Sequence, residues 1–119
     1  MSDYDSGNVF AKMLRGEITP DIIYQDEYVF AFHDAYPKAK VHVLIIPKGA
    51  YKNITQFGER ASDAELIAML RAVPKVAEMV GIKEGGYRTL INCDKDGGQE
   101  VPHLHLHLLG GEFVKLDLG

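Results

Sequence analysis

The sequence has a single cysteine, Cys93, and no tryptophan among its 119 residues. One cysteine cannot form an internal disulfide or a zinc site made of several thiolates, so both classes of stabilising cross-link are excluded. We interpret Cys93 as a small buried residue on a strand, since free cysteines are usually buried. A chain of this length buries about two thirds of its unfolded surface when it folds as one domain. We therefore expect a single domain over residues 1–119.

Basic runs and long apolar runs are also missing. Lysine and arginine do not cluster, the formal net charge is −4 and the pI is near 5.7. We therefore expect no nucleic acid polymer and no membrane as a partner, although a locally positive pocket can still bind a small anion. No stretch approaches the roughly 20 apolar residues of a membrane span, and the acidic start MSDYDSGNVF is unlike a signal peptide. A cytoplasmic protein is the expectation.

Apolar periodicity predicts two helices and five strands. A short helix is expected in SGNVFAKMLRGE, with Ser6 or Asn8 as its N-cap, and an amphipathic helix over 62–81, where Ser62 and Glu65 form a capping box. The predicted strands cover residues 22–24, 28–33, 41–48, 87–94 and 101–109. Most strands follow one another in hairpin order, which favours an α+β domain with a five-stranded antiparallel sheet and two helices.

The segment VPHLHLHLLGG, residues 101–111, has a histidine at every second position. Successive side chains of a strand point to opposite faces, so we expect His103, His105 and His107 to share one face. The intervening leucines, Leu104, Leu106 and Leu108, should face the core. The same alternation places Glu100 on the face opposite the histidines. Polar residues on a solvent face are ordinary, but three histidines in five residues indicate a chemical site.

Two kinds of chemistry fit these histidines. They can ligate zinc, but an extended strand spreads the three over about 13 Å, so at most two can share one ion. Alternatively, neutral imidazoles act as nucleophile and proton donor near neutral pH. The preceding DGGQ segment adds Gly97 and Gly98, whose backbone can approach a phosphate, although a plain turn explains them equally well.

The stretch GGQEVPHLHLHLLGG resembles the histidine triad family, whose defining motif is His, apolar, His, apolar, His, apolar, apolar. The resemblance extends over VFAKMLRGEI, FHD at 32–34, VHVLIIPK and LINCDKDGGQ, and so covers nearly the whole chain. It is closest in kind to the small histidine triad nucleotide-binding proteins, which are purine nucleoside phosphoramidases. The resemblance implies a homodimer with a ten-stranded sheet, no cofactor and no metal.

The resemblance also implies a role for each matching residue. His105 would attack the α-phosphorus and carry the nucleotidyl group, and the backbone carbonyl of His103 would orient its ring. His107 would contact the phosphate or protonate the leaving group, with His42 as a fourth active-site histidine. The implied nucleotide-binding residues are Asp34 at the ribose, Val9, Phe10, Met13 and Phe32 around the purine, and Asn92 and Gln99 on the phosphate side. Glu100 and Val101 complete the implied nucleotide-binding set, but the carboxylate of Glu100 should not face the phosphate directly.

The function implied is hydrolysis of the P–N bond of purine nucleoside 5′-phosphoramidates, and of aminoacyl adenylates, through a nucleotidyl-histidine intermediate. Two alternatives stay open: a nucleotide-binding or scaffold protein with incidental hydrolysis, and a metal-dependent hydrolase that uses the same histidines. Glu100 has two interpretations as well, a solvated loop carboxylate or a group that attracts cationic leaving groups. The terminal segment GEFVKLDLG departs from the ends of relatives, and a dimer would let it reach the partner's site.

Overall fold

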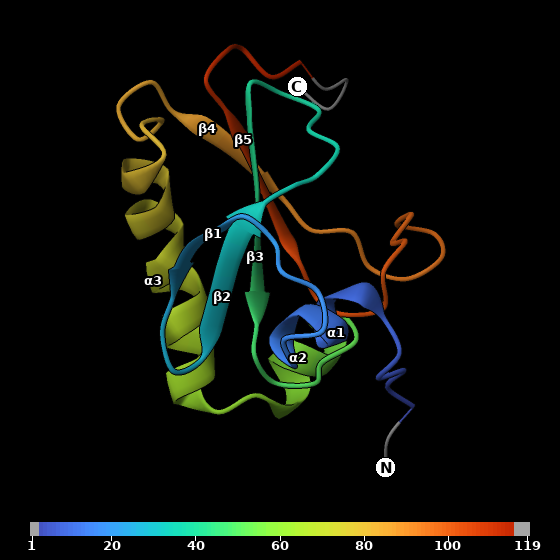
Figure 1. The fold of residues 1–119 in the computed structure, drawn as a ribbon. Coiled ribbons are helices and arrows are strands. Elements are labelled where there is room, and N and C mark those ends of the chain that lie inside the picture. Colours follow the sequence, from blue (N-terminus) through green and yellow to red (C-terminus); the bar gives the residue numbers. More distant parts are fainter. Residues whose placement is uncertain (1–2, 116–119) are drawn as a thin grey trace.

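The computed structural model describes residues 3–115, which form one five-stranded sheet and three helices (Figure 1). All neighbouring strands are antiparallel, and their order in the sheet is β1-β2-β3-β5-β4. The predicted α+β class and the five-stranded antiparallel sheet are confirmed. In chain order the elements are α1 (Val9–Leu14), β1 (Ile22–Gln25), β2 (Val29–His33), β3 (Val41–Pro47), α2 (Ile54–Arg60), α3 (Asp63–Met79), β4 (Tyr87–Leu90) and β5 (Leu106–Gly110).

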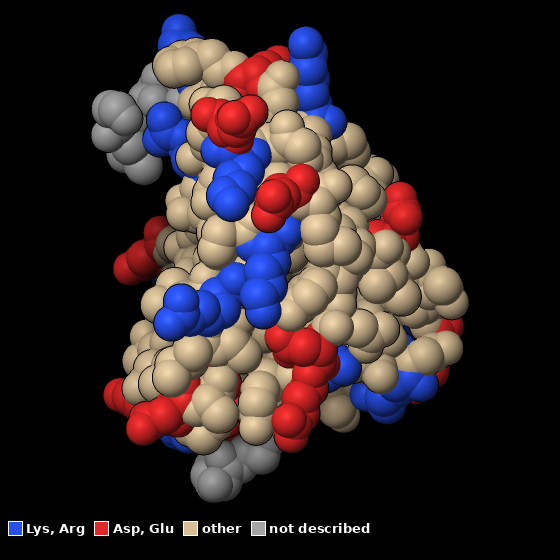
Figure 2. Space-filling model, turned by 90° about the vertical axis from the view of Figure 1, so that its left-hand side faces the viewer, with Lys and Arg blue, Asp and Glu red and all other residues tan. Residues whose placement is uncertain are grey.

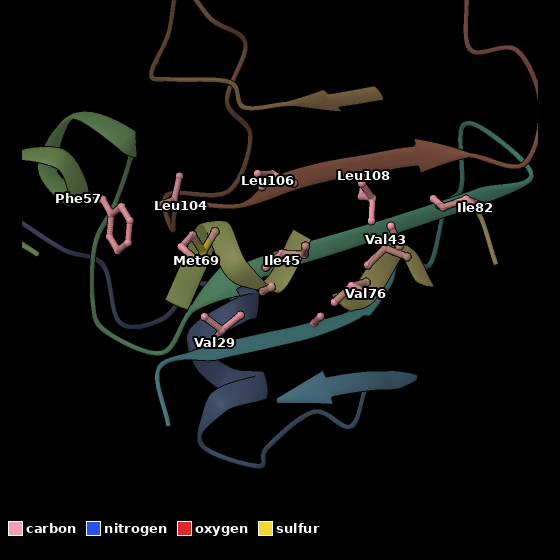
Figure 3. Close-up of a cluster of buried hydrophobic side chains, with 13 residues drawn as sticks. Val29, Val43, Ile45, Phe57, Met69, Val76, Ile82, Leu104, Leu106 and Leu108 are labelled. Atoms are coloured by element: carbon pink, nitrogen blue, oxygen red, sulfur yellow. The ribbon is translucent and has the colours of Figure 1, made fainter. Parts of the chain in front are cut away.

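The sheet face toward α3 holds the larger part of the core. Val43 and Ile45 of β3 and Leu106 of β5 lie in one buried cluster with Met69 and Val76 of α3 (Figure 3). The leucines between the histidines are all buried in this cluster, as predicted: Leu104, Leu106 and Leu108 are exposed by 0%, 6% and 0%. Burial of these side chains therefore fixes the direction in which residue 107 points, since it alternates with its leucine neighbours.

The opposite face of the sheet is covered in part by α1. Phe30 and Phe32 of β2 and Leu44 of β3 form a second buried cluster with Phe10 of α1. The rings of Phe10 and Phe32 meet edge to face, with their centroids 5.6 Å apart. His107 on β5 pairs in register with Leu44 on β3, so it belongs to this face. The α1 side of the sheet therefore combines an aromatic wall with a histidine.

Capping side chains define where the helices begin. Asn8 caps α1 by accepting a hydrogen bond from the Ala11 amide at 2.9 Å, and the predicted capping box of Ser62 and Glu65 is present at α3. The short helix α2 was not predicted. It begins after Asn53, whose side chain accepts from the Gln56 amide at 2.8 Å. An asparagine followed three residues later by a glutamine was the signal for this helix in the sequence.

The last strand is shorter than predicted. β5 begins at Leu106, so residues 101–105 do not form a strand, and β4 ends at Leu90 instead of continuing to Asp94. Two of the three triad histidines, His103 and His105, therefore lie on irregular backbone. Leu104 is nevertheless buried in the same cluster as Leu106 and Leu108, so the alternation continues to Leu104, although the pleated ladder on which it rests is absent from residues 101–105.

Charged side chains of both signs are interspersed over the side of the molecule on which α3 lies (Figure 2). Figure 2 shows Lys and Arg next to Asp and Glu across this face, without a continuous basic patch. Among residues 3–115, no helix has the length and apolar character needed to cross a lipid bilayer.

Candidate active site

Two neighbouring cavities meet at the histidines on the α1 side of the sheet. The apolar cavity has a volume of about 610 Å³, and its walls include Val9, Phe10, Met13, Phe32, Leu44 and Val101 together with His105. The charged cavity has a volume of about 550 Å³, and its walls include Lys38, His42, Glu112 and Lys115. Asp34, Tyr36, Glu100 and His107 line both. A ligand that occupies both cavities would therefore pass directly over the histidines.

His105 has one nitrogen engaged and one available. Its Nδ1 lies 2.8 Å from the backbone oxygen of His103. A carbonyl oxygen only accepts, so the proton of the ring is on Nδ1 and Nε2 keeps its lone pair. The ring is 7% exposed, and this burial lowers its pKa, so the imidazole is neutral near pH 7. His105 can therefore act as a nucleophile through Nε2.

His103 is fully buried and does not line either cavity. Its Nε2 lies 2.8 Å from the Pro47 oxygen, and its Nδ1 lies 2.5 Å from the Tyr4 hydroxyl. Burial lowers the pKa of His103 to about 4, against the opposing effect of the Pro47 carbonyl. The ring is therefore neutral. His103 contacts the nucleophile through its backbone oxygen, which accepts from His105 Nδ1.

His42 and His107 form a hydrogen-bonded pair with a defined direction. The Lys38 amide donates to His42 Nδ1 at 3.0 Å, so neutral His42 has its proton on Nε2. Burial lowers the pKa of His42, although the Asp34 carboxylate opposes this effect. His42 Nε2 then donates to His107 Nδ1 at 3.0 Å. His107 consequently has its own proton on Nε2.

The Nε2 of His107 is a donor without an acceptor. It is buried and has no hydrogen-bond partner among the described residues. Burial and the neighbouring His105 and His42 lower the pKa of His107 to about 4, so this N–H belongs to a neutral ring. A buried unsatisfied donor is rare in folded proteins and costs free energy. This N–H is therefore suited to an oxygen or nitrogen that a ligand supplies.

Asp34 lies immediately after β2, between the two cavities. One carboxylate oxygen accepts from the Tyr36 amide at 2.8 Å, and the other lies 3.4 Å from His42 Nε2. The side chain thus forms a turn, as expected for an aspartate before AYP, and also faces the site. Its carboxylate can accept hydrogen bonds from ligand hydroxyls.

Comparison with known proteins identifies the family that has this arrangement of residues. Residues 15–114 match the family model of the HIT domain, the histidine triad domain. The chain belongs to the HIT family. It is 50% identical over 108 residues to an uncharacterised HIT-like protein of Azospirillum brasilense, covering 91% of this chain and 88% of that protein. It is 45% identical over 103 residues to the purine nucleoside phosphoramidase of Escherichia coli, covering 87% and 86% of the two chains.

The fold of the HIT family is confirmed by a solved relative. A HIT family hydrolase from Legionella pneumophila matches 95% of this chain and 100% of its own, at 39% identity and a TM-score of 0.84. The histidine triad resemblance of the sequence is thus confirmed in both sequence and structure. The apolar residues predicted to surround a purine, Val9, Phe10, Met13 and Phe32, all line the apolar cavity, and Val101 lines it as well.

Two residues predicted at the HIT site, Asn92 and Gln99, line neither of the two cavities. The Gln99 side chain accepts from the Asp94 amide at 2.8 Å and donates to the Lys52 oxygen at 2.7 Å, so it folds the loop before the triad. Asn92 is half-buried and is not part of the wall of either cavity. Gly97 also serves the loop, because a Cβ there would lie 2.6 Å from the Cys93 oxygen. Phosphate-side roles for Asn92 and Gln99 stay predictions.

Glu100 is placed differently from the expectation. Strand alternation predicted it on the face opposite the histidines, but it lines both cavities. Its carboxylate raises the pKa of His105, against the larger lowering by burial. The prediction was wrong because strand pairing begins only at Leu106, so nothing maintains the alternation back through residues 101–103 to Glu100. Glu100 therefore contributes negative charge at the junction of the cavities.

The sequence left open an alternative in which the same histidines serve a metal-dependent hydrolase. Ligand atoms of Asp34, His42 and His107 all lie within 4.8 Å of one another. The three triad histidines do not form such a group. In the Asp34 cluster, the proton on His42 Nε2 is hydrogen-bonded to His107 Nδ1, so both of the nitrogens that would ligate a metal are already engaged with each other. Binding a cation there would require this proton to leave.

Several residues at the HIT site had no signal in the sequence. The Tyr4 hydroxyl is hydrogen-bonded to His103, 99 positions away in the chain, and no local sequence pattern predicts such a contact. His33, which received no role, is exposed and lines the apolar cavity. Glu112 lines the charged cavity and accepts from the Lys40 amide at 2.7 Å, so part of the terminal segment lies at its own chain's site. The rest of that segment, 116–119, lies outside the described residues.

Proposed function

We propose that the chain is a hydrolase that cleaves the P–N bond of purine nucleoside 5′-phosphoramidates, with His105 as the nucleophile. The observation that carries the proposal is the opposite proton placement on His105 and His107. His105 presents a lone pair on Nε2, and His107 presents an N–H on Nε2. A displacement at phosphorus needs one nucleophile and one donor for the oxygens or the leaving amine.

The reaction would proceed in two displacements. His105 Nε2 forms a bond to phosphorus while the P–N bond of the substrate breaks, and the departing amine takes up a proton. His107 Nε2–H, held in place by His42, donates a hydrogen bond to a phosphate oxygen or to the leaving nitrogen, and the proton that the amine gains comes from water, because neither neutral ring has a second proton to give. Water then attacks phosphorus, the bond to His105 breaks, and the nucleoside monophosphate leaves. Aminoacyl adenylates would react in the same way, with a carboxylate as leaving group.

The two cavities support the assignment of the substrate's parts. The apolar cavity is within the range of about 300–1,000 Å³ typical of small-molecule sites, and Phe10 and Phe32 offer aromatic surface to a purine. Asp34 at its rim would accept hydrogen bonds from the ribose hydroxyls. The charged cavity lies on the other side of His107 and would receive the leaving group. The identity with the Escherichia coli phosphoramidase supports this choice of substrate.

Hydrolysis of a fluorogenic adenosine 5′-phosphoramidate with and without EDTA, together with AMP binding by calorimetry, tests the proposal. We expect full turnover in the presence of the chelator. Loss of turnover on chelation would favour the metal-dependent hydrolase that the Asp34, His42 and His107 cluster allows. AMP binding without turnover would favour a nucleotide-binding or scaffold protein.

We also propose that the chain forms a homodimer by joining two sheets at β4 into one of ten strands. β4 is an edge strand in the described part of the chain, since the sheet order ends with it. Ile67 and Leu70 of α3 are exposed by 56% and 72%, which leaves apolar surface for a partner. A twofold contact of this kind is the commonest arrangement of soluble oligomers.

A further inference from the structure

The N-terminal segment lies against the segment that carries the nucleophile. The Tyr4 hydroxyl is 2.5 Å from His103 Nδ1, and the two rings meet edge to face with centroids 5.6 Å apart. The same hydroxyl accepts from Asn8 Nδ2 at 3.0 Å. Burial raises the pKa of Tyr4, so the hydroxyl keeps its proton. Tyr4 thus connects the start of α1 to the triad.

The direction of the hydrogen bond from Tyr4 follows from the other partner of His103. The Pro47 carbonyl faces His103 Nε2 at 2.8 Å and can only accept, so Nε2 has the proton of the neutral ring. Nδ1 is then an acceptor, and the Tyr4 hydroxyl donates to it. Both nitrogens of a fully buried imidazole are satisfied in this way. Without the Tyr4 hydroxyl, Nδ1 would lose the partner that fixes this orientation.

The orientation of His103 matters because its backbone is not held in the sheet. His103 precedes β5, and its carbonyl is the acceptor that orients His105. The neighbouring Leu104 amide donates to the Tyr51 oxygen, a loop contact and not a ladder bond. The side chain of His103 therefore supplies part of the anchoring that strand pairing supplies further along.

We propose that Tyr4 is a positioning residue for the nucleophile: its hydroxyl, held by Asn8, fixes the ring of His103 and thereby the carbonyl that aligns His105 Nε2. The inference rests on the proposed nucleophilic role of His105. Asn8 is also the N-cap of α1, whose Phe10 lies edge-on to His105 with centroids 5.0 Å apart. The N-terminal segment therefore contacts the triad at two points, at His103 through Tyr4 and at His105 through Phe10.

Tyr4→Phe keeps the ring that packs on His103 and removes only the hydroxyl. The matched control is Tyr24→Phe, which removes a hydroxyl bonded to Asp26 at 2.8 Å in the β1–β2 hairpin. We would measure kcat and KM for an adenosine 5′-phosphoramidate, thermal unfolding, and the imidazole ¹⁵N spectrum at pH 7. The spectrum reports tautomer and hydrogen bonding at each histidine nitrogen. The His103 signals report the Tyr4 contact itself, and the His105 signals report the alignment of the nucleophile, which a purely structural role of Tyr4 would leave unchanged.

We expect Tyr4→Phe to lower kcat about tenfold or more with KM changed less than about twofold, because a misaligned nucleophile slows the chemical step and leaves binding intact. The His103 Nδ1 resonance should shift, and Tyr24→Phe should match the wild type in kcat and in this resonance. A folded Tyr4→Phe protein with wild-type kcat would overturn the proposal, whether or not the His103 resonance shifts. A wild type without turnover would instead refute the proposed function, and the His103 resonance would still test the Tyr4 contact.

A second variant covers the case in which Tyr4→Phe does not fold. Asn8→Asp keeps an N-cap acceptor for the Ala11 amide but lacks the amide group that donates to Tyr4. Its carboxylate also competes with His103 for the Tyr4 proton. We expect kcat to fall several-fold with the same shift of the His103 resonance, and wild-type values of both would count against the proposal.

Discussion

His105 and His107 are two residues apart, yet their imidazole protons are on different nitrogens. His105 has its proton on Nδ1 because that atom faces the His103 oxygen, whereas His107 has its proton on Nε2 because Nδ1 accepts from His42. The first ring therefore offers a lone pair to the site and the second offers a donor. The partner that sets the proton of His105 is a backbone oxygen of the triad itself, and the partner that sets the proton of His107 is His42, outside the triad.

Replacing His105 with Asn should abolish turnover of an adenosine 5′-phosphoramidate while AMP affinity stays within about tenfold, because the substitution removes the bond-forming nitrogen and little binding surface. Single-turnover kinetics and calorimetry measure the two quantities. A variant with more than a few per cent of the wild-type rate would show that His105 is not the nucleophile. Thermal unfolding of the variant controls for loss of structure.

Activity should have an acid limb that lies below pH 6.5. His105 must be neutral to attack phosphorus, and burial lowers its pKa from 6.5. The rate therefore stays high as the pH falls through 6.5 and drops only when the ring becomes protonated at lower pH. The profile of kcat/KM against pH, measured between 3.5 and 8, reports this pKa for the free enzyme. An acid limb centred above 6.5 would contradict a buried neutral nucleophile.

Glu100 should make the enzyme prefer cationic leaving groups, because its carboxylate lines the charged cavity beside His107. We expect Glu100→Ser to reduce the ratio of kcat/KM for cationic over neutral amine phosphoramidates by several-fold, as an exposed ion pair worth up to about 1 kcal/mol would. Added salt should reduce the wild-type ratio in the same direction. The control is Glu84→Ser, an exposed loop residue. An unchanged ratio in Glu100→Ser would show that Glu100 is an ordinary solvated carboxylate with no part in leaving-group preference.

At the scale of elements, the irregular segment 101–105 decides the shape of the site. A regular strand would have spaced the three histidines evenly on one face and turned Glu100 away from them. Instead His103 is buried against Tyr4 and Pro47, while His105 remains at the apolar cavity. The segment is shaped by its loop contacts, among them the Leu104 amide on the Tyr51 oxygen.

Helix α2 also holds the loop before the triad. Asn53 caps this helix and donates to Asp94 at 3.2 Å. We expect Asn53→Ala to lower the free energy of unfolding by about 1–2 kcal/mol, since a lost N-cap costs about 1 kcal/mol and the partly buried hydrogen bond to Asp94 is lost with it. Ser62→Ala, which removes the cap of α3 alone, should cost less. Urea unfolding compares the two, and equal losses would show that the Asn53 contact with Asp94 adds nothing.

At the scale of the whole molecule, the two faces of the sheet have separate tasks. One face packs Val43, Ile45 and Leu108 under α3, and the other presents His42 and His107 beside the aromatic cluster of α1. Because every strand alternates between the faces, the core that stabilises the sheet also sets the spacing of the site.

In solution the chain should have a molar mass of twice 13.2 kDa, because we propose that its β4 edge and the exposed α3 residues meet a second copy. Light scattering after gel filtration measures this mass directly. Leu70→Asp, which places a charge on the exposed apolar face of α3, should weaken the dimer, whereas Glu84→Ser should not. A monomer at micromolar concentration would contradict the proposed pairing.

The sequence alone determined the class of fold, the presence of the five strands and the histidines of the site, but not the end of β4 or the start of β5. These follow from local rules: apolar and β-branched runs bounded by turn residues identified β2 and β3, capping residues identified α1 and α3, and the histidine spacing predicted a chemical site on a leucine-backed segment. The family resemblance rested on the same local motif, and the match over residues 15–114 confirmed it.

Only the tertiary structure decided the proton states and the side on which Glu100 lies. The tautomers of His103 and His107 depend on Tyr4, Pro47 and His42, which are between 56 and 99 positions away along the chain. Local periodicity carries no information about partners at such separations, since it describes one element at a time. The residue at which β5 begins, Leu106, is also decided by tertiary structure, because a strand exists only where a neighbouring strand pairs with it.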